Sequence, residues 1–167
     1  MFFNNKQFYK GVTFMELLVV IAIIGIMGSV GLVSLQSSKL DARLKAAQGE
    51  LVASIRLAQS YALQGKTQDG AAPCGYGFRF ASQTDYSIFY RTPDAGGCNP
   101  ASPRHNAESF VLKDGVQIDP ADVNQEIYFT VPFGNISGSG IGDFVLTHPN
   151  ADNKTVTVNN VGNVVEN

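Results

Sequence analysis

The sequence of 167 residues has no tryptophan, only two cysteines and only two histidines, and 16% of its residues are charged. Neither His105 nor His148 has a neighbouring nucleophile and carboxylate, so we expect no enzymatic activity and no cofactor. A basic excess is also lacking, since 12 basic and 14 acidic side chains give a formal net charge of -2. That balance argues against a general nucleic-acid binder. The 44% of apolar residues in turn excludes a wholly disordered chain.

Charge is entirely absent between residues 17 and 38, a run of 22 residues that is mostly aliphatic. As a helix this run would be about 33 Å long, close to the thickness of the hydrocarbon core of a bilayer. Lys6 and Lys10 precede it without any acid, which predicts a cytoplasmic N-terminus by the positive-inside rule. The run therefore excludes a plain soluble cytoplasmic domain and predicts a membrane segment.

Glu16 stands at the start of this run and is the only acid in the first 40 residues. A carboxylate at the edge of a membrane costs free energy unless it is paired, so Glu16 is a candidate functional residue. The passive alternative is that its side chain reaches the headgroup layer and water. A cleaved secretory signal is a further alternative for the run, with Ser29-Val30-Gly31 as a cleavage sequence, but the apolar run continues past it to Leu35.

Residues 10–21, KGVTFMELLVVI, resemble the N-terminal processing signal of type IV pilins and pseudopilins. The match comprises a basic leader, a glycine, a glutamate five residues later and an uninterrupted apolar helix. The resemblance implies cleavage between Gly11 and Val12 by a prepilin peptidase, methylation of Val12 and a role for Glu16 in assembly. Val12 departs from the phenylalanine or methionine that the family usually has there, which puts the efficiency of processing in doubt.

The resemblance also implies an organisation and a set of partners. Residues 1–11 would be a cleaved leader, residues 12–38 an apolar transmembrane and assembly helix, and residues 39–167 a periplasmic or extracellular head. The partners would be other pilins or pseudopilins in a helical filament, the prepilin peptidase, an inner-membrane assembly platform and, before assembly, membrane lipid. The chain would cross the bacterial inner membrane once, with its N-terminus in the cytoplasm, and then enter a periplasmic pseudopilus or a surface pilus.

Pairing between subunits gives Glu16 a physical role in such a filament. Cleavage would create a free amine at Val12, four residues before Glu16. The Glu16 carboxylate of one subunit could then pair with the Val12 amine of a neighbour. This pairing would remove two unfavourable charges from an apolar environment and set the axial register between subunits.

Beyond residue 38 the apolar residues recur with a helical period of about 3.6. The stripe comprises Leu40, Leu44, Ala47, Leu51, Ile55, Ala58 and Ala62. It predicts an amphipathic helix over residues 39–64, with Gly65 as its C-terminal stop.

From residue 76 onward a period of 2 predicts strands instead. The candidates are residues 76–80, 85–91, 110–113, 116–119, 126–131, 143–147, 155–159 and 163–166. Asp114-Gly115 separates two of them as a tight hairpin would. We therefore expect an α+β, pilin-like fold in which a long N-terminal helix packs on a small antiparallel β head.

Residues 50–66, ELVASIRLAQSYALQGK, are similar to the helix of H-type minor pseudopilins of type II secretion. Together the two resemblances imply a structural minor subunit of a type II secretion pseudopilus or a type IV pilus. The alternative is a filament-borne binding module for DNA uptake or adhesion. DNA capture requires a basic surface, whereas residues 121–167 hold five acids and one lysine, so nucleic acid is not expected as a partner.

Cys74 and Cys98 are the only cysteines, and an extracytoplasmic head predicts that they form a disulfide. Two free thiols are the alternative. Acids gather at Asp114, Asp119, Asp122 and Glu126, and carboxylates are the ligand type that Ca²⁺ binds. Their spacing misses the EF-hand pattern, so no metal site is predicted.

Overall fold

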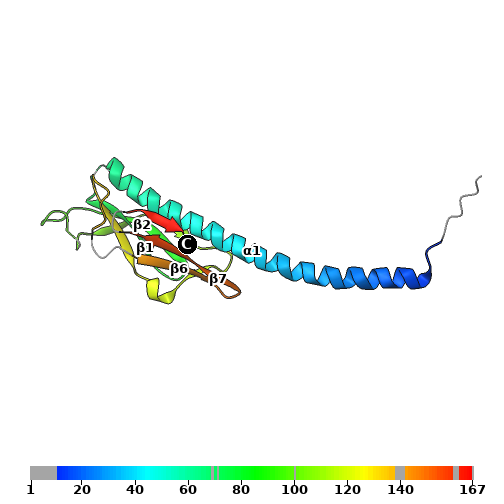
Figure 1. Ribbon diagram of the computed structural model, residues 1–167. Helices are drawn as coiled ribbons and strands as arrows, with labels where there is room; N and C mark the ends of the chain where they lie inside the picture. The colour runs from blue at the N-terminus through cyan, green and yellow to red at the C-terminus, as the bar shows by residue number, and fades with distance from the viewer. Residues whose placement is uncertain are drawn as a thin grey trace, which may run out of the picture. The chain divides into compact units, whose positions relative to one another are not determined.

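A computed structural model describes residues 11–68, 70, 72–99, 101–137, 142–159 and 162–166, without the side chains of residues 29–35. The chain divides into two compact units, Met1–Ser38 and Lys39–Asn167. One helix, α1 (Phe14–Gln64), contributes to both units (Figure 1). The predicted leader at residues 1–11 lies outside the described residues, except for Gly11.

The first unit contains the N-terminal part of α1. Its described large apolar side chains are exposed, as an apolar run without a covering layer must be. Among the described residues, no helix is both long enough and apolar enough to cross a membrane. The predicted run at residues 17–38 includes residues 29–35, whose side chains lie outside the description. Anchoring in a membrane therefore stays a prediction.

The second unit is the head, in which two four-stranded antiparallel sheets pack with the rest of α1 (Figure 1). Its elements are β1 (Gly75–Phe80), β2 (Asp85–Arg91), β3 (Arg104–Val111), β4 (Gln117–Ile118), the 3₁₀ helix η1 (Pro120–Asp122), β5 (Glu126–Thr130), β6 (Gly142–His148), β7 (Ala151–Val158) and β8 (Val164–Glu166). The first sheet has the order β3-β2-β1-β5, and the second has the order β4-β6-β7-β8. The expected α+β fold, a long helix on an antiparallel β head, is confirmed.

One hydrophobic core joins the helix and both sheets. Six of the seven residues of the predicted helical stripe are buried, while Leu40 is half-buried. Phe144 of the second sheet packs against Phe78 and Phe80 of the first, with ring centroids 5.9 and 5.5 Å apart. Because each large apolar side chain buried in this way contributes about 1.5–3 kcal/mol, the shared core is the main source of stability.

The C-terminus of α1 has the predicted glycine stop. Gly65 adopts a φ of 57°, which L-residues with a side chain rarely adopt. Its N–H donates to the carbonyl of Ala62, and the N–H of Lys66 donates to that of Tyr61. These two bonds form a Schellman cap, which satisfies two carbonyls at the end of the helix.

The strand expected at residues 110–113 is misplaced, because β3 begins at Arg104 and ends at Val111. The polar residues at its start carry no apolar alternation that would mark a strand. They are held instead by the main-chain ladder with β2, in which Arg91 pairs with Arg104. An edge strand with a solvated face can form in this way without an apolar pattern.

The expected hairpin at Asp114-Gly115 is wrong, although the turn itself is present. Both residues have positive φ, 58° and 77°, and the N–H of Val116 donates to the carbonyl of Lys113. The flanking strands do not pair with each other, since β3 pairs with β2 and β4 pairs with β6. The turn therefore carries the chain from one sheet to the other.

Asp41 forms two ion pairs, one within α1 and one that joins the helix to the second sheet. The carboxylate of Asp41 lies 3.0 Å from the Lys45 ammonium and 3.3 Å from that of Lys154 in β7. Hydrogen bonds from Lys45 and Lys154 lower the pKa of Asp41 below its usual value. All three side chains are accessible to solvent, so the contribution of these pairs to stability is small.

The predicted disulfide is present. It joins Cys74, just before β1, to Cys98 in the loop between β2 and β3, with Cα atoms 5.4 Å apart. The loop that leaves β2 at Arg91 and returns as β3 at Arg104 is thereby tied to the start of β1, where Gly75 pairs with Arg91.

Replacing Cys74 and Cys98 together by serine should lower the free energy of unfolding by about 3 kcal/mol, because the unfolded chain regains the freedom of a closed loop. Urea unfolding of the purified protein, followed by near-ultraviolet circular dichroism of its tyrosines, measures the change. Wild-type protein under reducing conditions is the matched control and should unfold at the same urea concentration as the double variant. Equal stability of the oxidised wild type and the variant would contradict the prediction.

Candidate functional site

The residues predicted to be processed lie at the start of α1 and are accessible. Gly11 and Val12 are exposed and precede the helix, so their backbone is not engaged in helical hydrogen bonds. The hydroxyl and carbonyl oxygens of Thr13 accept from the N–H of Glu16, at 3.3 and 3.1 Å. Thr13 therefore caps the helix, and Glu16 lies in its first turn, where the helix dipole favours a negative charge.

This cap is a feature that the sequence interpretation missed. Thr13 and Glu16 have the T-x-x-E spacing of a capping box directly before an apolar run, which was the available signal. The cap gives Glu16 a local role in the first helical turn in addition to the predicted role in assembly. The two roles use different atoms, because the cap uses the backbone N–H of Glu16.

The described side chains that follow Glu16 form an exposed apolar surface. Twelve large apolar residues between Val12 and Met27 are 49–77% exposed. They are Val12, Phe14, Met15, Leu17, Leu18, Val19, Val20, Ile21, Ile23, Ile24, Ile26 and Met27. Monomeric soluble proteins rarely expose a contiguous apolar surface of this kind, so it indicates contact with protein partners or with lipid.

A second group of residues lies on the face of the first sheet opposite the core. Successive residues of a strand point to opposite faces, and in β2 Ile88 and Tyr90 belong to the core. Phe89 and Arg91 therefore lie on the other face. Together with the residues that they contact on the neighbouring strands, they form a group that we call the outer-face cluster. Its members are Phe89, Arg91, Arg104, Glu126 and Tyr128.

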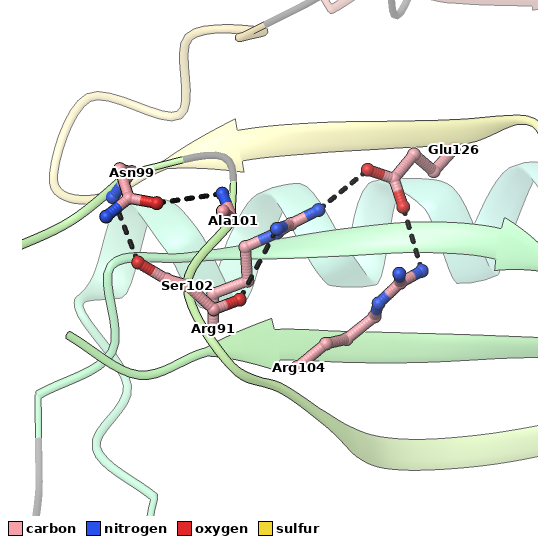
Figure 2. Close-up of polar contacts among 6 residues, drawn as sticks. All are labelled: Arg91, Asn99, Ala101, Ser102, Arg104 and Glu126. Atoms are coloured by element: carbon pink, nitrogen blue, oxygen red, sulfur yellow. Dashed lines mark hydrogen bonds and ion pairs between the residues drawn. The ribbon is translucent and has the colours of Figure 1, made fainter. Parts of the chain in front are cut away.

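Glu126 of β5 bridges two arginines in this cluster (Figure 2). Its Oε1 atom lies 2.8 Å from Nη2 of Arg91, and its Oε2 atom lies 2.9 Å from Nη1 of Arg104. The Arg91 side chain is only 8% exposed, whereas those of Arg104 and Glu126 are about one-third exposed. The carboxylate thus neutralises a buried guanidinium that would otherwise be strongly destabilising.

Aromatic rings complete the cluster. The guanidinium carbon of Arg91 lies 5.7 Å from the centre of the Phe89 ring and 5.4 Å from that of Tyr128. The two rings are stacked, with centroids 6.2 Å apart. Such cation–π contacts contribute about 0.5–2 kcal/mol each, most where water is excluded. Burial raises the pKa of Tyr128; Arg91 acts in the opposite direction and Glu126 in the same direction as burial.

Two glycines of β1 make room for these rings. A Cβ atom at Gly77 would lie 2.3 Å from the Phe89 ring, and one at Gly75 would lie 2.7 Å from the Tyr128 ring. The rings can therefore lie directly over the central strand only because these positions have no side chain. Alternate glycines within a strand were the sequence signal for such a close approach.

The cluster also holds the loop between β2 and β3. Nη1 of Arg91 donates to the carbonyl of Ser102 at 3.4 Å (Figure 2). Within the loop, the backbone N–H of Asn99 donates to the Ser102 hydroxyl, which donates in turn to the carbonyl of Gly97. Together with the Cys74–Cys98 disulfide, Arg91 thus attaches the loop to the first sheet.

The acids considered for Ca²⁺ do not converge. Asp119 accepts from the N–H of Ala121, and Asp122 accepts from Gln125 and from the N–H of Val145. Glu126 is occupied by the two arginines. Within the described part of the chain, no group of three or more potential ligands is arranged to hold a metal ion.

The fold is similar to that of a solved protein, the type IV minor pilin FimU of Pseudomonas aeruginosa strain PAO1. The two structures superpose with a TM-score of 0.52 at 14% sequence identity, over 76% of this chain and 90% of that chain. No protein-family profile matches the sequence, and no curated protein is significantly similar to it. The likeness establishes a pilin-like fold.

Substituting Glu126 by glutamine should lower the free energy of unfolding by about 2 kcal/mol, because the charge that balances buried Arg91 is lost. Arg104→Gln should cost less than about 1 kcal/mol, since Arg104 is exposed and Glu126 would keep its bond to Arg91. Urea unfolding measures both changes. Asp143→Asn, a change at an exposed carboxylate outside the cluster, is the control and should alter stability by at most about 0.5 kcal/mol. Equal losses for Glu126→Gln and Arg104→Gln would contradict the proposed importance of the buried pair.

Proposed function

We propose that this chain is a structural minor subunit of a filament, either a type IV pilus or the related type II secretion pseudopilus. The observation that carries the proposal is the exposed apolar surface between Val12 and Met27, on a helix that continues into a pilin-like head. A filament built on packed N-terminal helices would cover this surface. The head would then be displayed for contacts with other subunits.

This surface has to be covered by lipid or by protein. Leaving one large apolar side chain in water instead of burying it costs about 1.5–3 kcal/mol, and twelve such side chains are exposed. Before assembly the same surface would be stored in the bacterial inner membrane, with the two leader lysines in the cytoplasm. The helix would exchange lipid for protein contacts when the subunit enters the filament.

Processing would begin with cleavage between Gly11 and Val12 by a prepilin peptidase, followed by methylation of Val12. The exposed, non-helical backbone at residues 11–13 supports access by a peptidase. The new amine and the Glu16 carboxylate would then lie at the same end of α1. Pairing of Glu16 with the Val12 amine of a neighbouring subunit would set the register of the filament.

The choice between a pilus and a secretion pseudopilus concerns the cellular machine and not the assembly chemistry. The likeness to FimU supports a type IV minor pilin, and the similarity of residues 50–66 to H-type pseudopilins supports type II secretion. Immunogold labelling of surface filaments and a secretion assay in a deletion strain distinguish the two.

DNA uptake gains no support from the outer-face cluster, because Arg91 and Arg104 are both engaged by Glu126.

Mass spectrometry of the protein from producing cells should show a mature N-terminus at Val12 that carries one methyl group. Cells that lack the prepilin peptidase are the control and should yield the chain with its leader intact. An uncleaved chain in normal cells, or cleavage near Gly31, would contradict the proposed processing.

Replacing Glu16 by glutamine should leave cleavage intact but reduce the amount of protein in sheared filaments at least about tenfold, which corresponds to a loss of about 1.4 kcal/mol. The amide keeps the size of the side chain and the backbone cap but removes the charge. Asp143→Asn is the matched control, since it removes an exposed carboxylate elsewhere, and should assemble normally. Normal incorporation of Glu16→Gln would overturn the role of this carboxylate in assembly.

A further inference from the structure

A shallow groove of about 290 Å³ lies on the head between α1 and the turn that joins the two sheets. The residues that line it are Ala42, Arg43, Ala46, Ala47, Glu50, Lys113 and Asp114. The alanines line the α1 side of the groove, where Ala42 and Ala46 are exposed and Ala47 is buried. Small residues at such positions allow another helix to approach closely.

Four charged side chains line the groove together with these alanines. Arg43 and Glu50 come from α1, and Lys113 and Asp114 come from the turn. All four are exposed, and none takes part in an ion pair with another described residue. The ion pair of α1 with the second sheet involves other residues, Asp41 and Lys154. The groove therefore offers two cations and two carboxylates to an incoming group.

We propose that this groove binds the N-terminal segment of a second copy of this chain, residues 12–16. The inference rests on the proposed function, because it requires the amine that cleavage before Val12 creates. The segment then carries one positive and one negative group four residues apart, at Val12 and Glu16, with the exposed apolar side chains of Phe14 and Met15 between them.

The charges and the apolar surfaces of the two partners are complementary. The Glu16 carboxylate faces Arg43 and Lys113, and the Val12 amine faces Glu50 and Asp114. Phe14 and Met15 cover Ala42 and Ala46. A carboxylate has two oxygen atoms, so Glu16 can bind Arg43 of one neighbour and the Val12 amine of another. These contacts replace exposed charges by charge-assisted hydrogen bonds next to an apolar surface, where they are stronger than in water.

The geometry of such a contact suits a filament. The groove and the N-terminal segment are different surfaces of the same chain, so their contact is heterologous and leaves one groove and one segment open at the two ends. Repetition of a heterologous contact that does not close yields a helical array. The turn at Lys113–Asp114, which carries the chain between the sheets, thereby gains a role as one wall of a subunit interface.

Cysteine cross-linking in producing cells tests the contact in the full-length chain. A chain that carries both Met15→Cys and Ala46→Cys should form disulfide-linked multimers on non-reducing gels, because these positions would meet between copies. Met15→Cys combined with Ala53→Cys is the control, since Ala53 is exposed on the same helix but outside the groove. Absence of multimers in the first variant, equal multimers in the control, or cross-links only to a different protein would overturn the proposal.

Charge reversal supplies an independent measurement. Arg43→Glu combined with Lys113→Glu should reduce incorporation into sheared filaments at least tenfold, because the two cations that face the Glu16 carboxylate become like charges. Lys39→Glu is the matched control, because Lys39 is exposed on α1 one turn away and does not line the groove. Near-ultraviolet circular dichroism shows whether each variant keeps its folded head.

The outcomes separate this inference from the proposed function. Processing at Val12 and filament incorporation of the wild type, with no effect of the reversals at Arg43 and Lys113, would overturn the groove contact and leave the proposed function standing. Failure of the wild type to be cleaved or incorporated would overturn the proposed function itself, and the groove contact with it.

Discussion

The burial of residues 44–62 of α1 against two antiparallel sheets is the contact on which the rest of the head depends. It joins the sheets into one core, in which Phe144 meets Phe78 and Phe80. The same contact fixes the exposed face of the helix, including Ala42 and Ala46, beside the turn between the sheets. A helix that supplied only part of this stripe would leave two marginal sheets without a common core.

The N-terminal and C-terminal parts of α1 differ in how their apolar side chains are distributed. In the part of α1 that belongs to the head, buried and exposed residues recur with the helical period, because one side of the helix meets the sheets and the other meets solvent. Between Val12 and Met27 the described large apolar side chains are exposed instead. The stability of the head therefore comes from the first pattern, whereas the proposed assembly would use the second. The hydrogen bond from the Glu16 N–H to Thr13 caps the start of the helix, where the proposed pairing of Glu16 would take place.

On the outer face of the first sheet, several contacts together stabilise the buried charge of Arg91. Arg91 combines the Glu126 carboxylate, two aromatic rings and the carbonyl of Ser102. Gly75 and Gly77 leave the space that the rings occupy. The disulfide and Arg91 hold the same loop from two sides, so covalent and electrostatic constraints reinforce each other. This arrangement stabilises the head.

Local patterns in the sequence were sufficient to predict the helix, its end at Gly65, the strand at residues 85–91 and the turn at Asp114, because propensity, periodicity and turn chemistry act over a few residues. They were sufficient for the pairing of two cysteines as well. Only the tertiary structure decided that β3 and β4 pair with different sheets and that Arg91 and Arg104 share Glu126, 35 and 22 residues away. Such choices depend on which long-range contacts together bury the most apolar surface and give a buried charge such as Arg91 a partner, and no short segment contains that information.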